Sequence, residues 1–95
     1  MSAYGSGKPE IYNVVVGTSE SSFDSGTRVK KLMIQCRNDT ATLRLAWNSG
    51  ETATTYWSIK PGSIYWDDFI NRSGSLYLLS DAASTSVEIQ LWRST

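Results

Sequence analysis

The sequence predicts an all-β fold, a compact two-sheet antiparallel β-sandwich of about seven strands. Apolar residues alternate with other residues with a period of two, as at Val87, Ile89 and Leu91, and this period is typical of half-buried strands. Short apolar runs are separated by clusters of Gly, Asn, Asp and Ser, which are turn residues. A chain of 95 residues is long enough for one domain with a modest core.

Along the chain, residues 1–9 are small and polar, and we expect a flexible N-terminal leader there, before a single domain at 10–95. Seven strands are expected, at 10–16, 29–37, 42–47, 56–60, 64–67, 75–80 and 86–92. The Ser/Gly-rich stretch 18–27 is expected to be a loop that holds one aromatic residue, Phe23. Helix is expected only as a turn near residues 67–71.

Turn signals mark the strand boundaries. Asn48-Ser49-Gly50 follows one strand, and Pro61-Gly62 separates two others, because Pro fixes φ and Gly tolerates a positive φ. The phase of the alternation then predicts which side chains are buried. The expected core residues are Leu32, Ile34, Leu43, Leu45, Trp57, Ile59, Ile89 and Leu91.

Charge and composition exclude several function classes. Nine basic and nine acidic residues give no net charge, which argues against nucleic-acid binding driven by phosphate contacts. No apolar run approaches the roughly 20 residues of a membrane span, and no secretory signal is visible at the N-terminus. The single cysteine, Cys36, excludes an intrachain disulfide and is in phase with Leu32 and Ile34, so we expect a small buried hydrophobe.

No catalytic constellation is visible. The chain has no histidine, which removes histidine-based acid/base catalysis and most zinc sites. Asp67 and Asp68 are adjacent in a strand, so they point to opposite faces and make a poor acid/base pair. A calcium site formed by them with Asp81 lacks calcium-loop spacing. We therefore expect no enzyme activity, no cofactor and no metal.

Aromatic residues are the remaining signal. The pairs Tyr56-Trp57 and Tyr65-Trp66 flank the Pro61-Gly62 turn, and in a strand each pair has one ring on either face. Outward rings either stack sugars or form the centre of a protein contact. We predict an assembly interface that draws on Tyr4, Tyr12, Tyr56, Tyr65, Trp66 and Trp92.

Four segments of the chain carry a resemblance to a known family. They are Leu43-Arg-Leu-Ala-Trp47, Tyr56-Trp-Ser-Ile-Lys-Pro-Gly-Ser63, Leu76-Tyr-Leu-Leu-Ser-Asp81 and Val87-Glu-Ile-Gln-Leu-Trp92. Over residues 28–93 the chain resembles small β-sandwich capsid decoration (cement) proteins of tailed bacteriophages. The resemblance implies a non-enzymatic structural virion protein, made in the bacterial host cytoplasm, that stabilises the shell from the outer capsid surface. It also implies the major capsid protein as partner and a homo-oligomer, with a trimer favoured.

Two other functions are compatible with exposed aromatics on a sandwich. One is a carbohydrate-binding module, in which outward Tyr and Trp rings stack on a glycan. The other is a host-receptor-binding domain of a head or tail fibre, which combines assembly with recognition. Binding of the isolated domain to glycans would favour these alternatives, and co-purification with assembled particles would favour the decoration protein.

Overall fold

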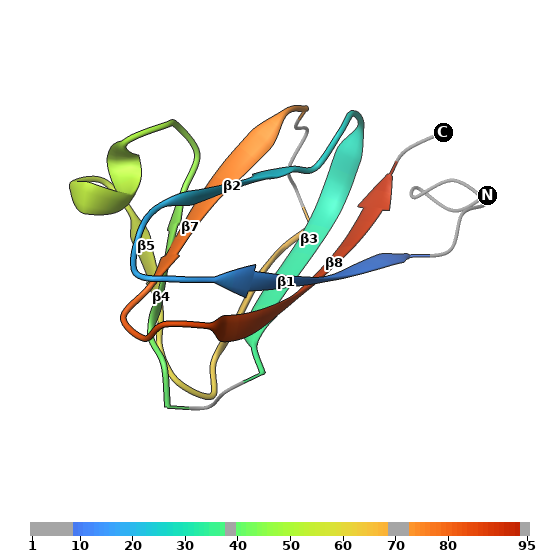
Figure 1. The fold of residues 1–95 in the computed structure, drawn as a ribbon. Helices are drawn as coiled ribbons and strands as arrows, with labels where there is room; N and C mark the ends of the chain where they lie inside the picture. Colours follow the sequence, from blue (N-terminus) through green and yellow to red (C-terminus); the bar gives the residue numbers. More distant parts are fainter. Residues whose placement is uncertain (1–8, 38–39, 69–72, 94–95) are drawn as a thin grey trace.

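The computed structural model describes residues 9–37, 40–68 and 73–93, which form eight strands in two packed antiparallel sheets (Figure 1). Sheet A contains, in spatial order, β1 (Glu10–Val16), β8 (Thr85–Arg93), β3 (Val29–Cys36) and β6 (Ile64–Asp67). Sheet B contains β2 (Ser21–Asp24), β7 (Ser75–Ser80), β4 (Leu43–Ala46) and β5 (Trp57–Ile59). The all-β sandwich predicted from the sequence is confirmed, with eight strands in place of seven.

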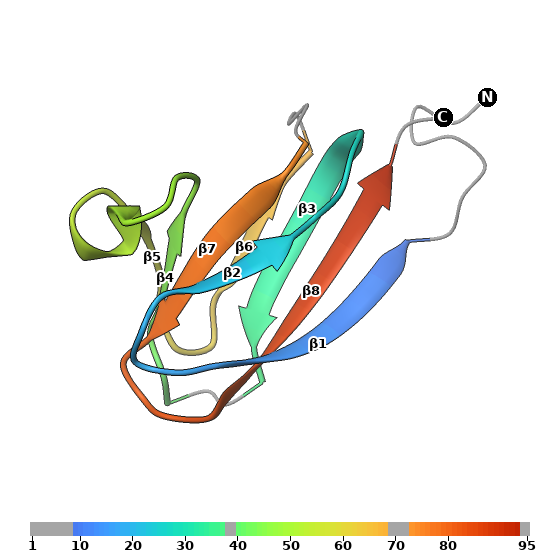
Figure 2. The same cartoon turned by 45° about the horizontal axis from the view of Figure 1, so that its top comes forward.

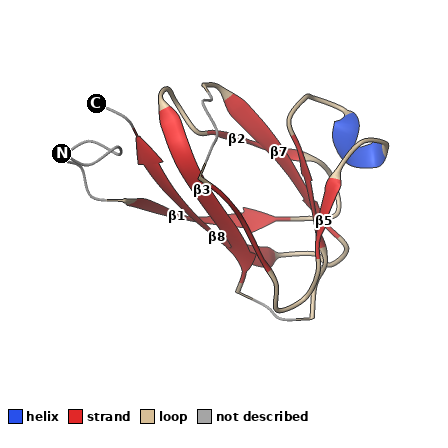
Figure 3. Ribbon diagram, turned by 180° about the vertical axis from the view of Figure 1, so that it is seen from behind, coloured by secondary structure: helices blue, strands red, loops and turns tan. Residues whose placement is uncertain are grey.

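The connections between strands make this sandwich a jelly roll. Every connection between consecutive strands passes to the other sheet, except the one from β4 to β5. The resulting orders, β1-β8-β3-β6 and β2-β7-β4-β5, are those of an eight-stranded jelly roll with two Greek keys. Figure 2 shows β1, β8 and β3 side by side, and Figure 3 shows both layers from behind.

The core is the dry layer between the two sheets. Twelve apolar side chains from six strands fill it, each no more than 2% exposed: Val16, Val29, Leu32, Ile34, Leu43, Leu45, Ile59, Leu76, Leu78, Val87, Ile89 and Leu91. Seven of the eight core residues expected from the alternation are among them, so the predicted phase of those strands is confirmed. Cys36 is half-buried and packs against the same cluster.

Trp57 is the exception, since its side chain is 63% exposed and the prediction that it lies in the core is wrong. Its phase is correct, because it pairs with the buried Leu45 across the β4–β5 ladder. β5 is, however, the edge strand of sheet B. Among the described residues no strand of sheet B lies beyond it, and its ring contacts that of Tyr65 on β6, with 6.4 Å between the ring centroids.

The opposite edge of the sandwich is closed by a second aromatic contact. Tyr12 of β1 pairs with the buried Ile89, and Phe23 of β2 pairs with the buried Leu76, so both rings point between the sheets. Their centroids lie 5.2 Å apart in an edge-to-face arrangement, a geometry that aromatic pairs favour. Aromatic contacts thus cover both open edges of the core.

Three local expectations need correction or fall outside the description. The loop expected at 18–27 contains strand β2, whose pairing with β7 overrides the weak strand propensity of its serines. The helical turn lies at Glu51–Ala53, between β4 and β5, whereas Asp67 ends β6 and residues 69–71 lie outside the described residues. Residues 1–8 of the expected leader also lie outside them.

Replacing Leu45 with Ala is expected to lower the free energy of unfolding by about 2–5 kcal/mol, because the fully buried side chain leaves a cavity between the sheets. The measurement is chemical denaturation followed by tryptophan fluorescence. Ile64→Val is the control, because that side chain is half-exposed and the loss of one methylene group is expected to change stability by no more than about 0.5 kcal/mol. Equal effects of the two substitutions would contradict the assignment of inner and outer faces.

Candidate functional site

The outer face of sheet A is the surface on which the most unusual side chains gather. The strand registers determine its members, because residues paired across a ladder point to the same side. One row across the sheet contains Ile11, Gln90, Met33 and Trp66. The next contains Asn13, Glu88, Gln35 and Ile64, and the rows on either side add Val15 with Ser86 and Trp92 with Lys31.

Much of this face is apolar and exposed to solvent. Ile11 is 65% exposed, Val15 68%, Ile64 49% and Trp66 57%, which places on one face four of the large exposed hydrophobic residues of the described chain. Single exposed apolar residues are ordinary on protein surfaces. A concentration of them on one face is typical of an interaction site.

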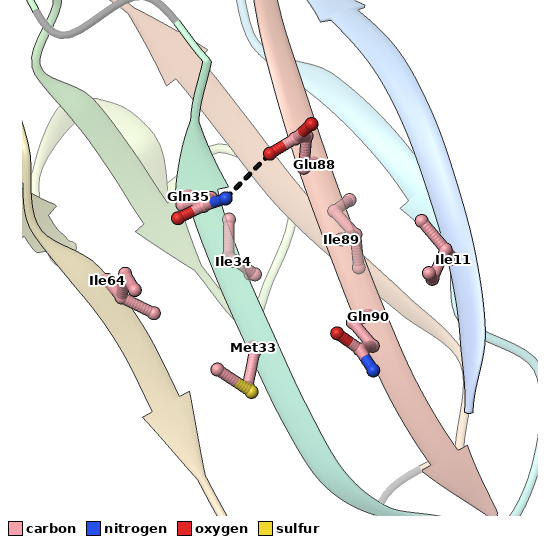
Figure 4. A pocket seen from close by; sticks show the side chains of 8 residues that line it. All are labelled: Ile11, Met33, Ile34, Gln35, Ile64, Glu88, Ile89 and Gln90. Atoms are coloured by element: carbon pink, nitrogen blue, oxygen red, sulfur yellow. Dashed lines mark hydrogen bonds between the residues drawn. The ribbon is translucent and has the colours of Figure 1, made fainter. Parts of the chain in front are cut away.

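A groove of about 290 Å³ runs across the middle of this face (Figure 4). Ile11 on β1 and Ile64 on β6 stand on its two sides, with Met33 of β3 between them. The polar side chains that line the groove come from the two central strands, and they are Gln35, Glu88 and Gln90. The groove therefore combines apolar walls with a polar strip along its floor.

The polar strip is organised around the carboxylate of Glu88. Gln35 Nε2 donates to Glu88 Oε1 at 2.6 Å, and Arg37 Nε donates to Glu88 Oε2 at 2.9 Å. Arg37 Nη2 also donates to Asn13 Oδ1 at 3.3 Å, which extends the network to β1. The bonds from Arg37 and Gln35 hold the pKa of Glu88 below its usual range. Glu88 is thus an ionised anchor for its neighbours and is poorly suited to take up a proton.

Two of the predicted interface residues, Trp66 and Trp92, meet on this face through Lys31. The Lys31 ammonium lies 4.7 Å from the centroid of the Trp92 ring and 5.6 Å from that of Trp66. Both distances are within the range of cation–π attraction. The ammonium group of Lys31 therefore interacts with both indole rings, those of Trp66 and Trp92.

The other predicted interface residues lie elsewhere. Tyr56 belongs to the side of sheet B, where the guanidinium carbon of Arg44 lies over its ring, 4.4 Å from the ring centroid. Tyr12 and Tyr65 point between the sheets, and burial raises the pKa of the Tyr65 hydroxyl. Tyr4 lies outside the described residues. The five described residues of the predicted interface do not form one surface. The expected division of the second pair, with one ring inside and one outside, is confirmed by Tyr65 and Trp66.

Sequence reasoning missed the aliphatic part of this face. Ile11, Val15 and Ile64 lie opposite in phase to the inward residues of their strands, so both faces of β1 carry large apolar side chains. That two-sided pattern was a visible signal in the stretch 10–16. What the sequence did not show was that β1 and β6 stand at opposite edges of one sheet, with the groove between them.

The described residues bring no three His, Cys, Asp or Glu side chains together in a way that would hold a metal ion. Asp81, considered above for calcium, accepts a hydrogen bond from the backbone N–H of Thr42 at 3.0 Å. Within the ranges described, no helix is long and apolar enough to cross a membrane. Comparison of the chain with protein-family models, curated proteins and solved structures found no match.

Replacing Arg37 with Gln is expected to raise the pKa of Glu88 toward its ordinary value, because the strongest bond to the ionised carboxylate is lost. In the parent protein the stability that this bond contributes is present at neutral pH and disappears as the pH falls through the lowered pKa. The measurement is a carboxyl-carbon NMR titration. Arg44→Gln, on the side of sheet B, is the control and should leave the Glu88 titration unchanged; identical titrations in all three proteins would contradict the network.

Proposed function

We propose that this chain is a non-enzymatic structural virion protein of a tailed bacteriophage, a capsid decoration protein made in the host cytoplasm. It binds the major capsid protein through the outer face of sheet A and stabilises the shell from outside. The observation that carries the proposal is the exposed apolar face around the groove, with Ile11, Ile64 and Trp66 next to the Lys31–Trp92 stack. The resemblance of residues 28–93 to phage decoration proteins supplies the biological setting.

The composition of this face suits a protein contact. Tryptophan is enriched among the residues that dominate binding energy, and Trp66 and Trp92 supply large rigid rings. Arg37 and Gln35 already donate to Glu88 within the domain, so a partner can cover this strip while these bonds stay in place. Jelly rolls occur in viral capsid proteins, and this fold-level analogy agrees with the proposal without carrying it.

A glycan is the second candidate ligand, and the groove favours it for a specific reason. Planar amide and carboxylate groups from Gln35, Gln90 and Glu88 line its floor, and Trp66 stands in the row next to Ile64. Hydroxyl groups pair well with such side chains, and sugar rings stack on indoles. Lectin domains also use the jelly roll. This would be the function of a receptor-binding head or tail fibre domain.

The test uses particles of the phage that encodes the chain, stripped of this protein, and measures rebinding by co-sedimentation. The double substitution Trp66→Ser with Trp92→Ser is expected to lower the affinity for the particles about tenfold or more, because two large rings leave the contact. Tyr56→Ser is the matched control, since it removes one partly exposed ring from the side of sheet B. Circular dichroism verifies that each variant is folded.

Unchanged occupancy for the double variant would overturn the proposed face. Loss of occupancy with Tyr56→Ser alone would move the contact to sheet B. A glycan array run on the same three proteins separates the second candidate. Glycan binding that the Trp66 and Trp92 substitutions abolish, with no binding to particles by the parent, would replace the decoration function with a receptor function.

A further inference from the structure

Strand β1 differs from the other three edge strands of the sandwich. It is seven residues long, and it pairs with β8 over all seven without a register shift. The other edge strands, β2, β5 and β6, have four, three and four residues. A long, regular edge strand presents a row of unpaired N–H and C=O groups that readily pairs with another chain.

The short edges also carry the features that usually prevent such pairing. β6 ends at Asp67 and is followed by Asp68, and β5 is followed by Lys60 and Pro61. Charges and proline at an edge discourage the addition of a further strand. β1 has no proline and no lysine within Glu10–Val16, and its one charge is at the first position.

That one charge is already engaged. Arg93 Nε donates to Glu10 Oε2 at 2.7 Å, and Arg93 Nη2 donates to Glu10 Oε1 at 3.1 Å. The pair lies at the N-terminal end of β1 and fixes it to the end of β8. The remaining six residues of β1 are uncharged, and three of them are valines.

We propose that β1 pairs antiparallel with β1 of a second copy of this chain, across a two-fold axis at Asn13. The two copies of sheet A then form one continuous eight-stranded sheet. Asn13 is the middle residue of Glu10–Val16, so this is the two-fold register that pairs all seven residues of both strands. Among the described residues, sheet A has no strand on the far side of β1.

The register matches side chains on both faces. On the outer face it sets Ile11 of one copy opposite Val15 of the other, and these are the two most exposed large aliphatic residues of the described chain. On the inner side it sets Tyr12 opposite Val14, and Glu10 opposite Val16, so no two like charges meet. Apolar cross-strand pairs of this kind stabilise a sheet.

Such pairing also accounts for the apolar outer half of β1. Ile11 forms one side of the groove, and after pairing Val15 of the second copy lies directly beside it. The outer faces of two sheets then merge into one surface with two grooves. This pairing is independent of the capsid or glycan function. It makes a two-fold dimer in place of the trimer that the family resemblance implies, because an isologous contact closes with two copies.

The test compares two double variants by sedimentation equilibrium. In the first variant, Ile11→Lys with Val15→Lys, a lysine faces a lysine of the other copy at both symmetry-related pairs of the proposed register. The second variant, Ile11→Lys with Val15→Glu, removes similar apolar surface, but at both pairs a lysine faces a glutamate of the other copy. The nearest residues on β8 are Gln90 and Ser86, which are uncharged, so within one copy the two variants are closely matched.

We expect the parent chain to sediment as a dimer. The like-charge variant should dissociate at a concentration about tenfold or more above that of the opposite-charge variant. The two symmetry-related charge pairs repel in the first variant and attract in the second. Ile64→Lys, on the far edge of sheet A, is the control and should leave the dimer intact. Circular dichroism verifies folding of each protein.

A parent chain that is a monomer from micromolar to millimolar concentration overturns the inference, as does a trimer. Equal dissociation of the two double variants overturns the register. A covalent probe tests the axis directly: in a Cys36→Ala background, Asn13→Cys should form a disulfide-linked dimer on oxidation, since residues that face each other on paired strands lie within disulfide range. Ser22→Cys on edge strand β2 is the control, and cross-linking of both at the same rate would contradict the β1 axis.

Discussion

The dry layer between the two sheets is the constraint on which the rest of this structure depends. A domain of this size has only two layers, so each strand turns one set of alternate residues inward and the other set outward. Twelve of the inward side chains are aliphatic and no more than 2% exposed. Once Leu32, Ile34, Ile89 and Leu91 are inside, the residues between them are on the outer face of sheet A, whatever their polarity.

The two outer faces obey the same constraint with different results. Arg44 and Tyr56 stack on the side of sheet B, and the Arg44 guanidinium also donates to the backbone oxygen of Thr52. On sheet A, the edge strands β1 and β6 contribute aliphatic and indole side chains, and the central strands contribute the bonded polar strip. The outer face of sheet A is therefore the face that gains most from being covered, and sheet A is also the sheet whose β1 edge we propose to pair with a second copy.

The inner half of this arrangement was predictable from the sequence, because it depends on local alternation. The two-residue alternation within each strand is enough to predict the burial of Leu43, Leu45, Ile59 and Ile89. β2 was missed because Ser21-Ser22-Phe23-Asp24 has little strand propensity of its own and is held by its pairing with β7. The exposure of Trp57 was missed because it depends on β5 being an edge strand, which is a property of the topology.

The candidate site was predictable only in part, for the same reason. Alternation indicated that one of Tyr65 and Trp66 points outward, but which residues share a surface with it depends on the order β1-β8-β3-β6. That order joins residues from the first strand, such as Ile11, to residues more than fifty positions later, such as Ile64 and Trp66. No local pattern contains this information, since it arises from connections that cross between the sheets.

We propose that the outer face of sheet A is the surface covered in the working assembly. Hydroxyl-radical footprinting of the chain on particles and free in solution, read by mass spectrometry, tests it most directly, because Trp and Met side chains are sensitive probes. We expect oxidation of Trp66, Trp92 and Met33 to fall on the particle, while oxidation of Tyr56 and Trp57 stays as it is in the free chain. Protection of Tyr56 and Trp57 with undiminished oxidation of Trp66 would contradict it.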